Sequence, residues 1–204
     1  MQAKTRLDDI LARLRETEKE LEQELDKLLA SKREQFNYSL SRGKVVFERG
    51  VRLWQRQQRT GLWLYLRKAP LAYILSAPLI YGMIIPLLIL DLCTTLYQHI
   101  CFRIYHIPRV RRSEYMVIDR HHLAYLNIIE KFNCLYCGYG NGLMAYAREV
   151  VARTEQYWCP IKHARRVLDP HSRAQRFLDY GDSTAWHENL QKFRQQLTDD
   201  SEAR

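Results

Sequence analysis

Four residues in the C-terminal half of the chain have the types and the spacing of a metal site. They are Cys134, Cys137, Cys159 and His163. Two thiolates at C-x2-C spacing can bind one ion when the backbone makes a tight turn, and a histidine four residues after a cysteine lies one helical turn away on the same side. Three thiolates and one imidazole are a closed tetrahedral set suited to structural zinc, so we predict a Cys3His zinc site.

The residues around these ligands favour a metal-binding turn. Gly138 follows the second cysteine and relieves the turn, and the proline after Cys159 suits the first position of a helix. The run Cys134-Leu-Tyr-Cys137-Gly-Tyr resembles the knuckle of rubredoxins and zinc ribbons, and Cys159-Pro resembles the start of their second knuckle. Where that knuckle has its second cysteine, this chain has Ile, Lys and then His163. Iron or an iron–sulfur cluster therefore remains an alternative to zinc.

Other assignments of these residues stay open at the level of sequence. The clustered cysteines could be small buried hydrophobic residues without a metal, and His171 could replace His163 as the fourth ligand. A second group that could hold a metal or act in acid–base chemistry is Asp119, His121, His122 and Glu130. The simpler interpretation of that group is a helix cap followed by packed histidines. The chain has no nucleophile elbow, phosphate loop or HExxH motif, so whether it is an enzyme is left open.

The metal ligands would be positioned by a small helical domain over residues 119–180. Its helices are predicted at residues 119–132, 143–157 and 160–168. A glycine-rich turn over residues 138–142 would separate the first two helices. After it, residues 181–204 are predicted to form a C-terminal helix and tail, with Gly181, Asp182 and Ser183 at the helix start.

An apolar segment over residues 69–102 precedes this domain and predicts a membrane-associated protein. Its only carboxylate is Asp91, and 34 residues of straight helix would measure about 51 Å, against a hydrocarbon core of about 30 Å. Pro78 and Pro86, with Gly82 between them, are expected to kink or break the helix. Two topologies remain: one crossing from Leu71 to Leu90 followed by an interfacial helix, or a re-entrant helix–break–helix. Positive residues on both flanks favour re-entry with both ends cytoplasmic.

The flanks of the apolar segment are basic, and the whole chain has a formal charge of +9. Residues 36–68 mix arginine and lysine with tryptophan, tyrosine and valine, which predicts a basic interfacial helix that binds anionic lipid. Residues 103–118 are predicted to be a basic linker, with a short strand near its end. No nucleic-acid recognition fold is visible, so lipid is favoured over nucleic acid as the partner of these charges.

Residues 1–35 predict one long amphipathic helix with the pattern of a coiled coil. Leucines recur every seven residues, at positions 7, 14, 21 and 28. Leu11 and Leu25 fill half of the alternate seam positions, and Glu18 and Lys32 occupy the others. Both self-association and packing on the same chain are compatible with this pattern. No signal peptide is recognised at the N-terminus.

The predicted fold is therefore mostly α, with a coiled-coil-like helix, a re-entrant or single transmembrane segment and a Cys3His knuckle domain. Five cysteines, an odd number, favour a reducing compartment and hence a cytoplasmic metal domain, at the inner membrane if the source is bacterial. The leading hypothesis is a membrane-anchored zinc-binding scaffold or accessory subunit that binds anionic lipid and a protein partner or a second copy. The alternative is a membrane-bound metalloenzyme or iron redox protein acting at the lipid interface through Asp91, Asp119, His121 or His122.

Overall fold

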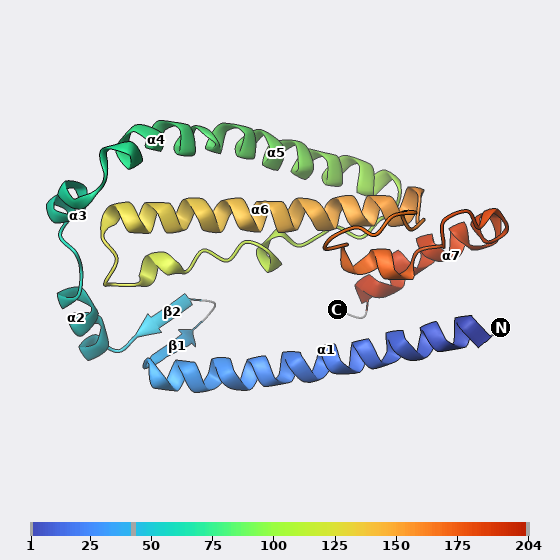
Figure 1. Ribbon diagram of the computed structural model, residues 1–204, viewed down its shortest axis with the longest axis horizontal. Helices are drawn as coiled ribbons and strands as arrows, with labels where there is room; N and C mark the ends of the chain where they lie inside the picture. Colours follow the sequence, from blue (N-terminus) through green and yellow to red (C-terminus); the bar gives the residue numbers. More distant parts are fainter. Residues whose placement is uncertain (1, 42–43, 203–204) are drawn as a thin grey trace. The chain divides into compact units, whose positions relative to one another are not determined.

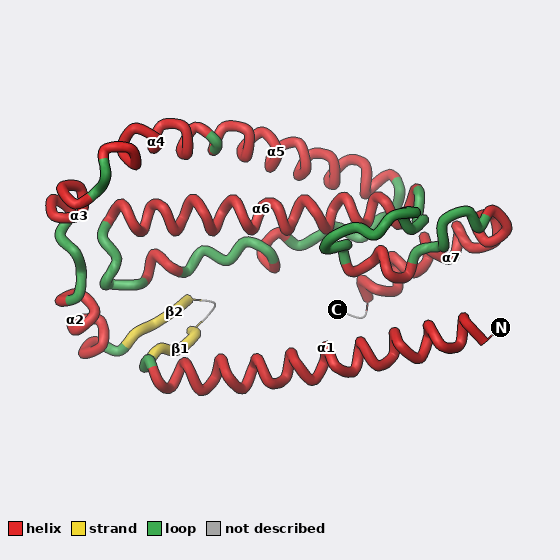
Figure 2. Tube along the Cα trace, viewed as in Figure 1, coloured by secondary structure: helices red, strands yellow, loops and turns green. Residues whose placement is uncertain are grey.

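The computed structural model describes residues 2–41 and 44–202 and is mostly helical, as predicted (Figures 1 and 2). The chain divides into two compact units. The first unit contains residues 1–61 and 119–127, and the second contains residues 62–118 and 128–204. The boundaries differ from the predicted domains because a segment distant in sequence completes the first unit.

The first unit begins with the predicted long helix and continues with a hairpin. Its elements are α1 (Gln2–Gln35), β1 (Tyr38–Ser41), β2 (Lys44–Phe47) and α2 (Arg49–Gln57). The strands are antiparallel, with Tyr38 opposite Phe47 and Leu40 opposite Val45. The prediction of one interfacial helix over residues 36–68 is therefore wrong. Val45, Val46 and Phe47 lie in the two-stranded ribbon, which suits their strand preference, whereas Trp54 lies in α2.

Residues 119–127 complete the first unit without forming the predicted helix. They contain one short 3₁₀ turn, η3 (Arg120–His122), and then extend at Leu123, whose backbone angles are φ −67° and ψ 117°. The backbone N–H of Ala124 donates a hydrogen bond of 3.3 Å to Oε1 of the buried Gln55. Leu123 and Tyr125 line a hollow together with the aromatic side chains of the hairpin and α2. Tertiary contacts therefore replace the local helical hydrogen bonds here.

The second unit contains the apolar segment as one run of helix that lies along α6 (Ile128–Trp158) (Figure 1). A short helix, α3 (Leu62–Lys68), precedes it. The run itself consists of α4 (Leu71–Gly82), α5 (Ile84–Tyr97) and one π-helical stretch, η1 (Gln98–Phe102). Pro78 lies inside α4, and the chain turns only slightly at Met83, so the helix–break–helix hairpin is not formed.

The run from Leu71 to Phe102 is long and apolar enough to cross a membrane. It has 32 residues and a mean hydropathy of 2.1. As a helix it measures about 48 Å, more than a hydrocarbon core of about 30 Å.

The glycine-rich stretch of residues 138–142 lies in the middle of α6 and makes no turn, so that prediction was wrong. A Cβ atom on Gly142 would lie 2.8 Å from the carbonyl oxygen of Tyr115 and 3.1 Å from Cα of Met116. A Cβ on Gly138 would lie 3.6 Å from the carbonyl oxygen of Val117. The glycines therefore let residues 115–117 pass close to the helix surface, and the predicted strand at this place is absent from the described structure.

After α6 the chain loops back through η4 (Ser172–Arg176) to α7 (Ser183–Glu202). The predicted helix over residues 160–168 is not formed. Instead Lys162 donates its backbone N–H to the Leu178 carbonyl and Leu178 donates to the Pro160 carbonyl, both at 2.8 Å. The last helix begins as predicted, because Oδ1 of Asp182 accepts the N–H of Ala185 at 2.9 Å.

Side chains from α5, η1, α6, α7 and the chain between η1 and α6 form the core of the second unit. Its fully packed members are Leu87, Phe102, Ile107, Val110, Leu143, Tyr146, Val150 and Leu197. This core fixes α6 as the central helix of the unit, so α6 is the element that positions the candidate sites.

Candidate functional site

The structure does not bring the predicted metal ligands together. Cys134 and Cys137 lie in the first half of α6, while Cys159 comes directly after the last residue of this helix. At a rise of 1.5 Å per residue, the separation of 22 positions from Cys137 to Cys159 corresponds to about 33 Å of helix. One ion needs sulfur ligands at about 2.3 Å, so these residues do not fit a shared zinc, iron or cluster site in this fold.

The other residues weighed as ligands are also dispersed. Over residues 2–41 and 44–202, no group of three or more His, Cys, Asp or Glu side chains is placed to hold a metal. His121 and His122 lie in the first unit, where their rings stack at 3.9 Å between centroids, whereas Glu130 belongs to α6 in the second. The zinc knuckle is not formed, and the knuckle sequence instead supplies part of a helix.

The ionisable residue of the apolar segment makes a charged hydrogen-bond cluster. Asp91 receives two hydrogen bonds from Arg112, at 2.7 Å to Oδ1 and 2.6 Å to Oδ2. The Tyr139 hydroxyl donates to Oδ2 at 2.7 Å, and Thr95 donates to Oδ1 at 3.3 Å. Asp91 is 8% exposed, so its charge is removed from solvent and compensated by a guanidinium that reaches in from the chain after η1.

A second polar side chain of the same helical run fixes the returning chain. Gln98 donates to the Tyr146 hydroxyl at 2.6 Å, and its Oε1 accepts the backbone N–H of Val110 at 3.0 Å. The Tyr97 hydroxyl lies 3.0 Å from the hydroxyl of Thr154 on α6. These contacts tie the end of the apolar run to both neighbouring segments through its polar groups.

In α5 and η1, three polar side chains face the protein together with Leu87 and Phe102, while most aliphatic side chains of α5 face outward. Asp91, Thr94 and Gln98 share one helix face and are each at most 9% exposed. The aliphatic side chains of α5 that are more than half exposed are Ile85, Leu88, Ile89, Leu92 and Leu96. Amphipathic helices at the surface of water-soluble proteins show the opposite distribution.

A wide apolar cavity lies between the start of the run and the first half of α6. It measures about 940 Å³ and includes Ile74, Ala77, Ile80, Phe132 and Cys137 in its lining. The Tyr81 hydroxyl donates to Oδ1 of Asn133 at 2.6 Å across it. The second predicted metal ligand, Cys137, thus borders an apolar hollow.

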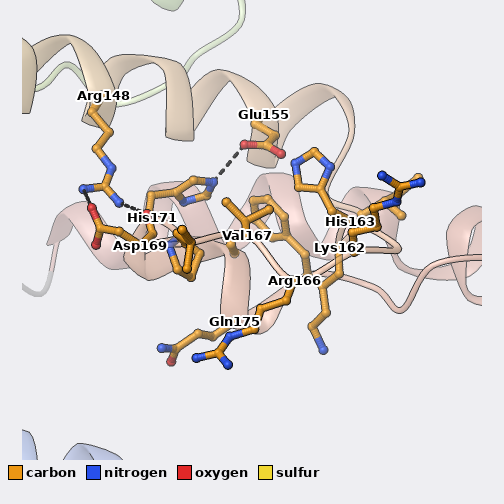
Figure 3. A pocket seen from close by; sticks show the side chains of 15 residues that line it. Arg148, Glu155, Lys162, His163, Arg166, Val167, Asp169, His171 and Gln175 are labelled. Atoms are coloured by element: carbon orange, nitrogen blue, oxygen red, sulfur yellow. Dashed lines mark hydrogen bonds and ion pairs between the residues drawn. The ribbon is translucent and has the colours of Figure 1, made fainter.

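A basic pocket of about 550 Å³ lies between the C-terminal part of α6 and the loop that follows this helix (Figure 3). Figure 3 shows Arg148 and Glu155 projecting from α6 towards the loop that carries Asp169 and His171. Nε2 of His171 lies 2.8 Å from Oε2 of Glu155, and Nη1 of Arg148 donates to Oδ2 of Asp169 at 3.0 Å. His163, the predicted fourth metal ligand, lines this pocket and is exposed.

Beside the pocket, a buried ion-pair network attaches the loop to α6. Glu149 accepts hydrogen bonds from Arg153 at 2.8 Å and from Arg173 at 2.9 Å, and each of the three side chains is at most 13% exposed. Arg153 also donates to the Pro108 carbonyl at 2.7 Å. Burial raises the pKa of Glu149, but the hydrogen bonds and charges of the two arginines outweigh it and hold this pKa below its ordinary value.

The thiol at the end of α6 is not activated. Burial, together with the charge of Glu155, raises the pKa of Cys159 above its ordinary value of 9.0. A raised pKa leaves the thiol protonated at neutral pH in the metal-free protein, which disfavours nucleophilic attack by this residue.

Sequence reasoning found several pocket residues but gave them another role. The sequence offers His163 and His171 as alternative metal ligands, and both line this pocket. Arg148 and Glu155 were missed, because only the return of the loop onto α6 brings residues 21 and 16 positions apart into contact. The available signal was the density of Lys and Arg between Pro160 and Pro170.

Comparisons with protein-family models, with curated proteins and with solved structures find no match to this chain.

Proposed function

We propose that the protein is a membrane-anchored scaffold or accessory subunit, with the helical run Leu71–Phe102 as its anchor. The single observation that carries the proposal is that aliphatic side chains of this run are exposed while Asp91, Thr94 and Gln98 are buried. Only 6% of its most apolar window is buried within the protein, whereas the core helix of a water-soluble protein is mostly buried. Each Leu or Ile side chain left in water forgoes about 1.5–3 kcal/mol of burial free energy, so a whole exposed face requires an apolar surrounding.

The Asp91 cluster supports the same proposal. An ionised carboxylate is costly in hydrocarbon, and such residues face the protein interior and are paired where membrane helices carry them. Asp91 meets both conditions, because it faces α6 and is bound by Arg112 and Tyr139. The helix therefore presents an uncharged surface on its outward side.

The scaffold role is supported by the exposed apolar stripe of α1. Leu14, Leu21 and Leu28 recur at heptad spacing and are 53%, 69% and 59% exposed. Heptad leucines on an exposed helix are typical of a surface that pairs with another helix. We propose that α1 binds a helix of a partner protein or of a second copy of this chain.

Membrane extraction tests the anchor. The full chain should stay in the membrane fraction through high salt and sodium carbonate and leave only with detergent, because salt screens charge but not apolar partitioning. Leu88→Lys with Leu92→Lys, on the exposed face, should release the chain or prevent insertion. Leu168→Lys, at an exposed site in the loop after α6, is the control and should remain in the membrane. Release of the unmodified chain by carbonate would refute the anchor.

Cross-linking in detergent tests the pairing of α1. Leu21→Asp should remove the cross-linked species of higher mass, because it places a charge in the middle of the leucine stripe. Gln23→Asp, at an exposed position of the same helix off the stripe, should leave that species unchanged. If neither variant differs from the unmodified chain, α1 does not pair through this face.

A further inference from the structure

The basic pocket beside the C-terminal part of α6 has more positive charge than the carboxylates in its lining compensate. Its lining includes four arginine and lysine side chains, Arg148, Lys162, Arg165 and Arg166, against the two carboxylates Glu155 and Asp169. With the histidines neutral, the lining has a net charge of +2, from four positive and two negative groups.

Several of these groups are already engaged, which shows which ones remain for a ligand. Arg148 is bound by Asp169, and Lys162 donates to Asp179 at 2.8 Å. His171 is bound by Glu155. Within the part of the chain that the structure describes, His163, Arg165 and Arg166 make no hydrogen bond or ion pair and are exposed.

We propose that this pocket binds a phosphate group, with Arg165 and Arg166 as its principal ligands. A guanidinium presents paired N–H donors that match two oxygens of a phosphate, and two adjacent arginines without partners provide two such donors. His163, which lines the same pocket, supplies a further N–H donor. A cavity of about 550 Å³ accommodates a phosphorylated headgroup or a small phosphate ester.

The backbone that carries these donors is held on both sides. The Ile161–Leu178 bridge joins the two ends of the loop, and the Glu149 network attaches the segment of Arg173 to α6. The loop itself contains Asp169 at φ +55°, where its carboxylate binds Arg148. The arginines therefore project from a loop with fixed ends, which lowers the ordering cost of binding a ligand.

The surroundings of the pocket indicate a membrane lipid as the source of the phosphate. Just before the loop, Tyr157 and Trp158 pack against Tyr105 with ring centroids 5.4 and 5.2 Å apart. Tyrosine and tryptophan gather where a membrane protein meets the headgroup layer. These aromatic residues lie near the end of the apolar run, so a phospholipid phosphate would lie at the level of the pocket. This choice of source rests on the proposed anchor, whereas the phosphate chemistry does not.

The test uses the full chain in detergent and two double variants of equal charge. Arg165→Gln with Arg166→Gln removes the proposed ligands, and Arg103→Gln with Arg109→Gln removes two exposed cations near the same end of the apolar run. One arm measures binding of phosphatidylglycerol and of diacylglycerol, which lacks the phosphate, by native mass spectrometry. The other arm measures binding of glycerol 3-phosphate and of inorganic phosphate by ³¹P NMR. Thermal unfolding checks that both variants remain folded.

We expect phosphatidylglycerol to bind more tightly than diacylglycerol, and the Arg165/Arg166 variant to weaken this binding at least tenfold. The Arg103/Arg109 variant should bind within about twofold of the unmodified chain. If binding of glycerol 3-phosphate depends equally on Arg165 and Arg166, the phosphate site is supported and its ligand is a soluble phosphate ester. The proposal is overturned if no phosphate compound binds, or if both double variants weaken binding alike. Because the ³¹P arm needs no membrane, failure of the anchor alone leaves its result intact.

Discussion

Arg112 binds Asp91 through two parallel hydrogen bonds of 2.7 and 2.6 Å, although 21 residues and the turn after η1 separate them. The carboxylate is almost fully buried on an otherwise apolar helix, while the arginine keeps 44% of its side chain exposed. The pair therefore fixes where the returning chain crosses α5.

Loss of Arg112 should destabilise the fold more than loss of the pair. Arg112→Leu leaves the buried carboxylate of Asp91 without its arginine charge and should lower the free energy of unfolding by about 3 kcal/mol. This is the lower end of the range for broken buried pairs, because Arg112 is partly exposed. Asp91→Leu combined with Arg112→Leu should cost less than the sum of the single variants by roughly 1–3 kcal/mol. Denaturant unfolding in detergent measures this double-mutant cycle. Arg111→Leu is the control, because its ion pair with Glu114 is exposed and 4.0 Å long. Additive single variants would contradict the coupling.

Gly142→Ala should lower stability while Gly138→Ala raises it. Both variants replace a glycine in the interior of α6. The higher helix propensity of alanine alone should raise the free energy of unfolding by about 1 kcal/mol. At Gly142 the new Cβ meets backbone atoms of Tyr115 and Met116 at 2.8 and 3.1 Å, and the resulting overpacking should cost about 1–3 kcal/mol. At Gly138 the nearest atom is 3.6 Å away, an ordinary contact. Thermal unfolding should shift in opposite directions, and equal shifts would refute the close approach.

Acid should weaken the Glu149 network. The pKa of Glu149 is lower in the folded protein than its ordinary value of 4.5, so its contribution to stability is complete above pH 4.5 and is lost as the pH falls through the folded pKa. Glu149→Gln should cost about 1.5–3 kcal/mol at neutral pH, since it removes charged hydrogen bonds. The difference from the unmodified chain should shrink as unfolding is measured from pH 7 down to pH 3. A difference independent of pH would contradict the assignment.

Metal analysis can separate the sequence prediction from the structure. The ligand motif predicts one zinc per chain that is lost on replacing any of Cys134, Cys137, Cys159 or His163. The structure predicts that the four single replacements by Ser or Ala behave independently, with unfolding changed by less than about 1 kcal/mol where the site is exposed. Inductively coupled plasma analysis of purified variants decides between them. One zinc lost equally in all four variants would mean that α6 breaks at its glycines.

Where helix periodicity was strong and local, the sequence predicted the element correctly. The heptad leucines predict α1, which is formed as one helix. The uncharged stretch predicts an apolar segment of membrane length, but the break favoured at its prolines is not formed. Asp182 was correctly placed at the start of α7, because its side chain caps a backbone N–H three residues later and needs no distant partner. These features depend on contacts within a few residues.

The errors occurred where distant segments supply the contacts. Gly138 after Cys137 is typical of a metal-binding turn, but it continues α6. Gly142, in the same helix, makes room for Tyr115, 27 residues earlier in the sequence. The chain after Pro160 bonds to Leu178 rather than to itself, and Gln55 holds Ala124 out of a helix. The basic pocket likewise needs the loop to fold back on Arg148. No short-range pattern contains these pairings.

During synthesis, the two main partners of Asp91, Arg112 and Tyr139, leave the ribosome one after the other. A ribosome that adds about 5–20 residues per second releases Arg112, 21 residues after Asp91, about 1–4 s later, and Tyr139, 48 residues after Asp91, about 2–10 s later. During synthesis the apolar helix therefore emerges with an uncompensated acid, which acquires its arginine before its tyrosine. A nascent chain that stops before residue 112 carries this helix without its counter-charge, and one that stops before residue 139 carries it with the arginine alone.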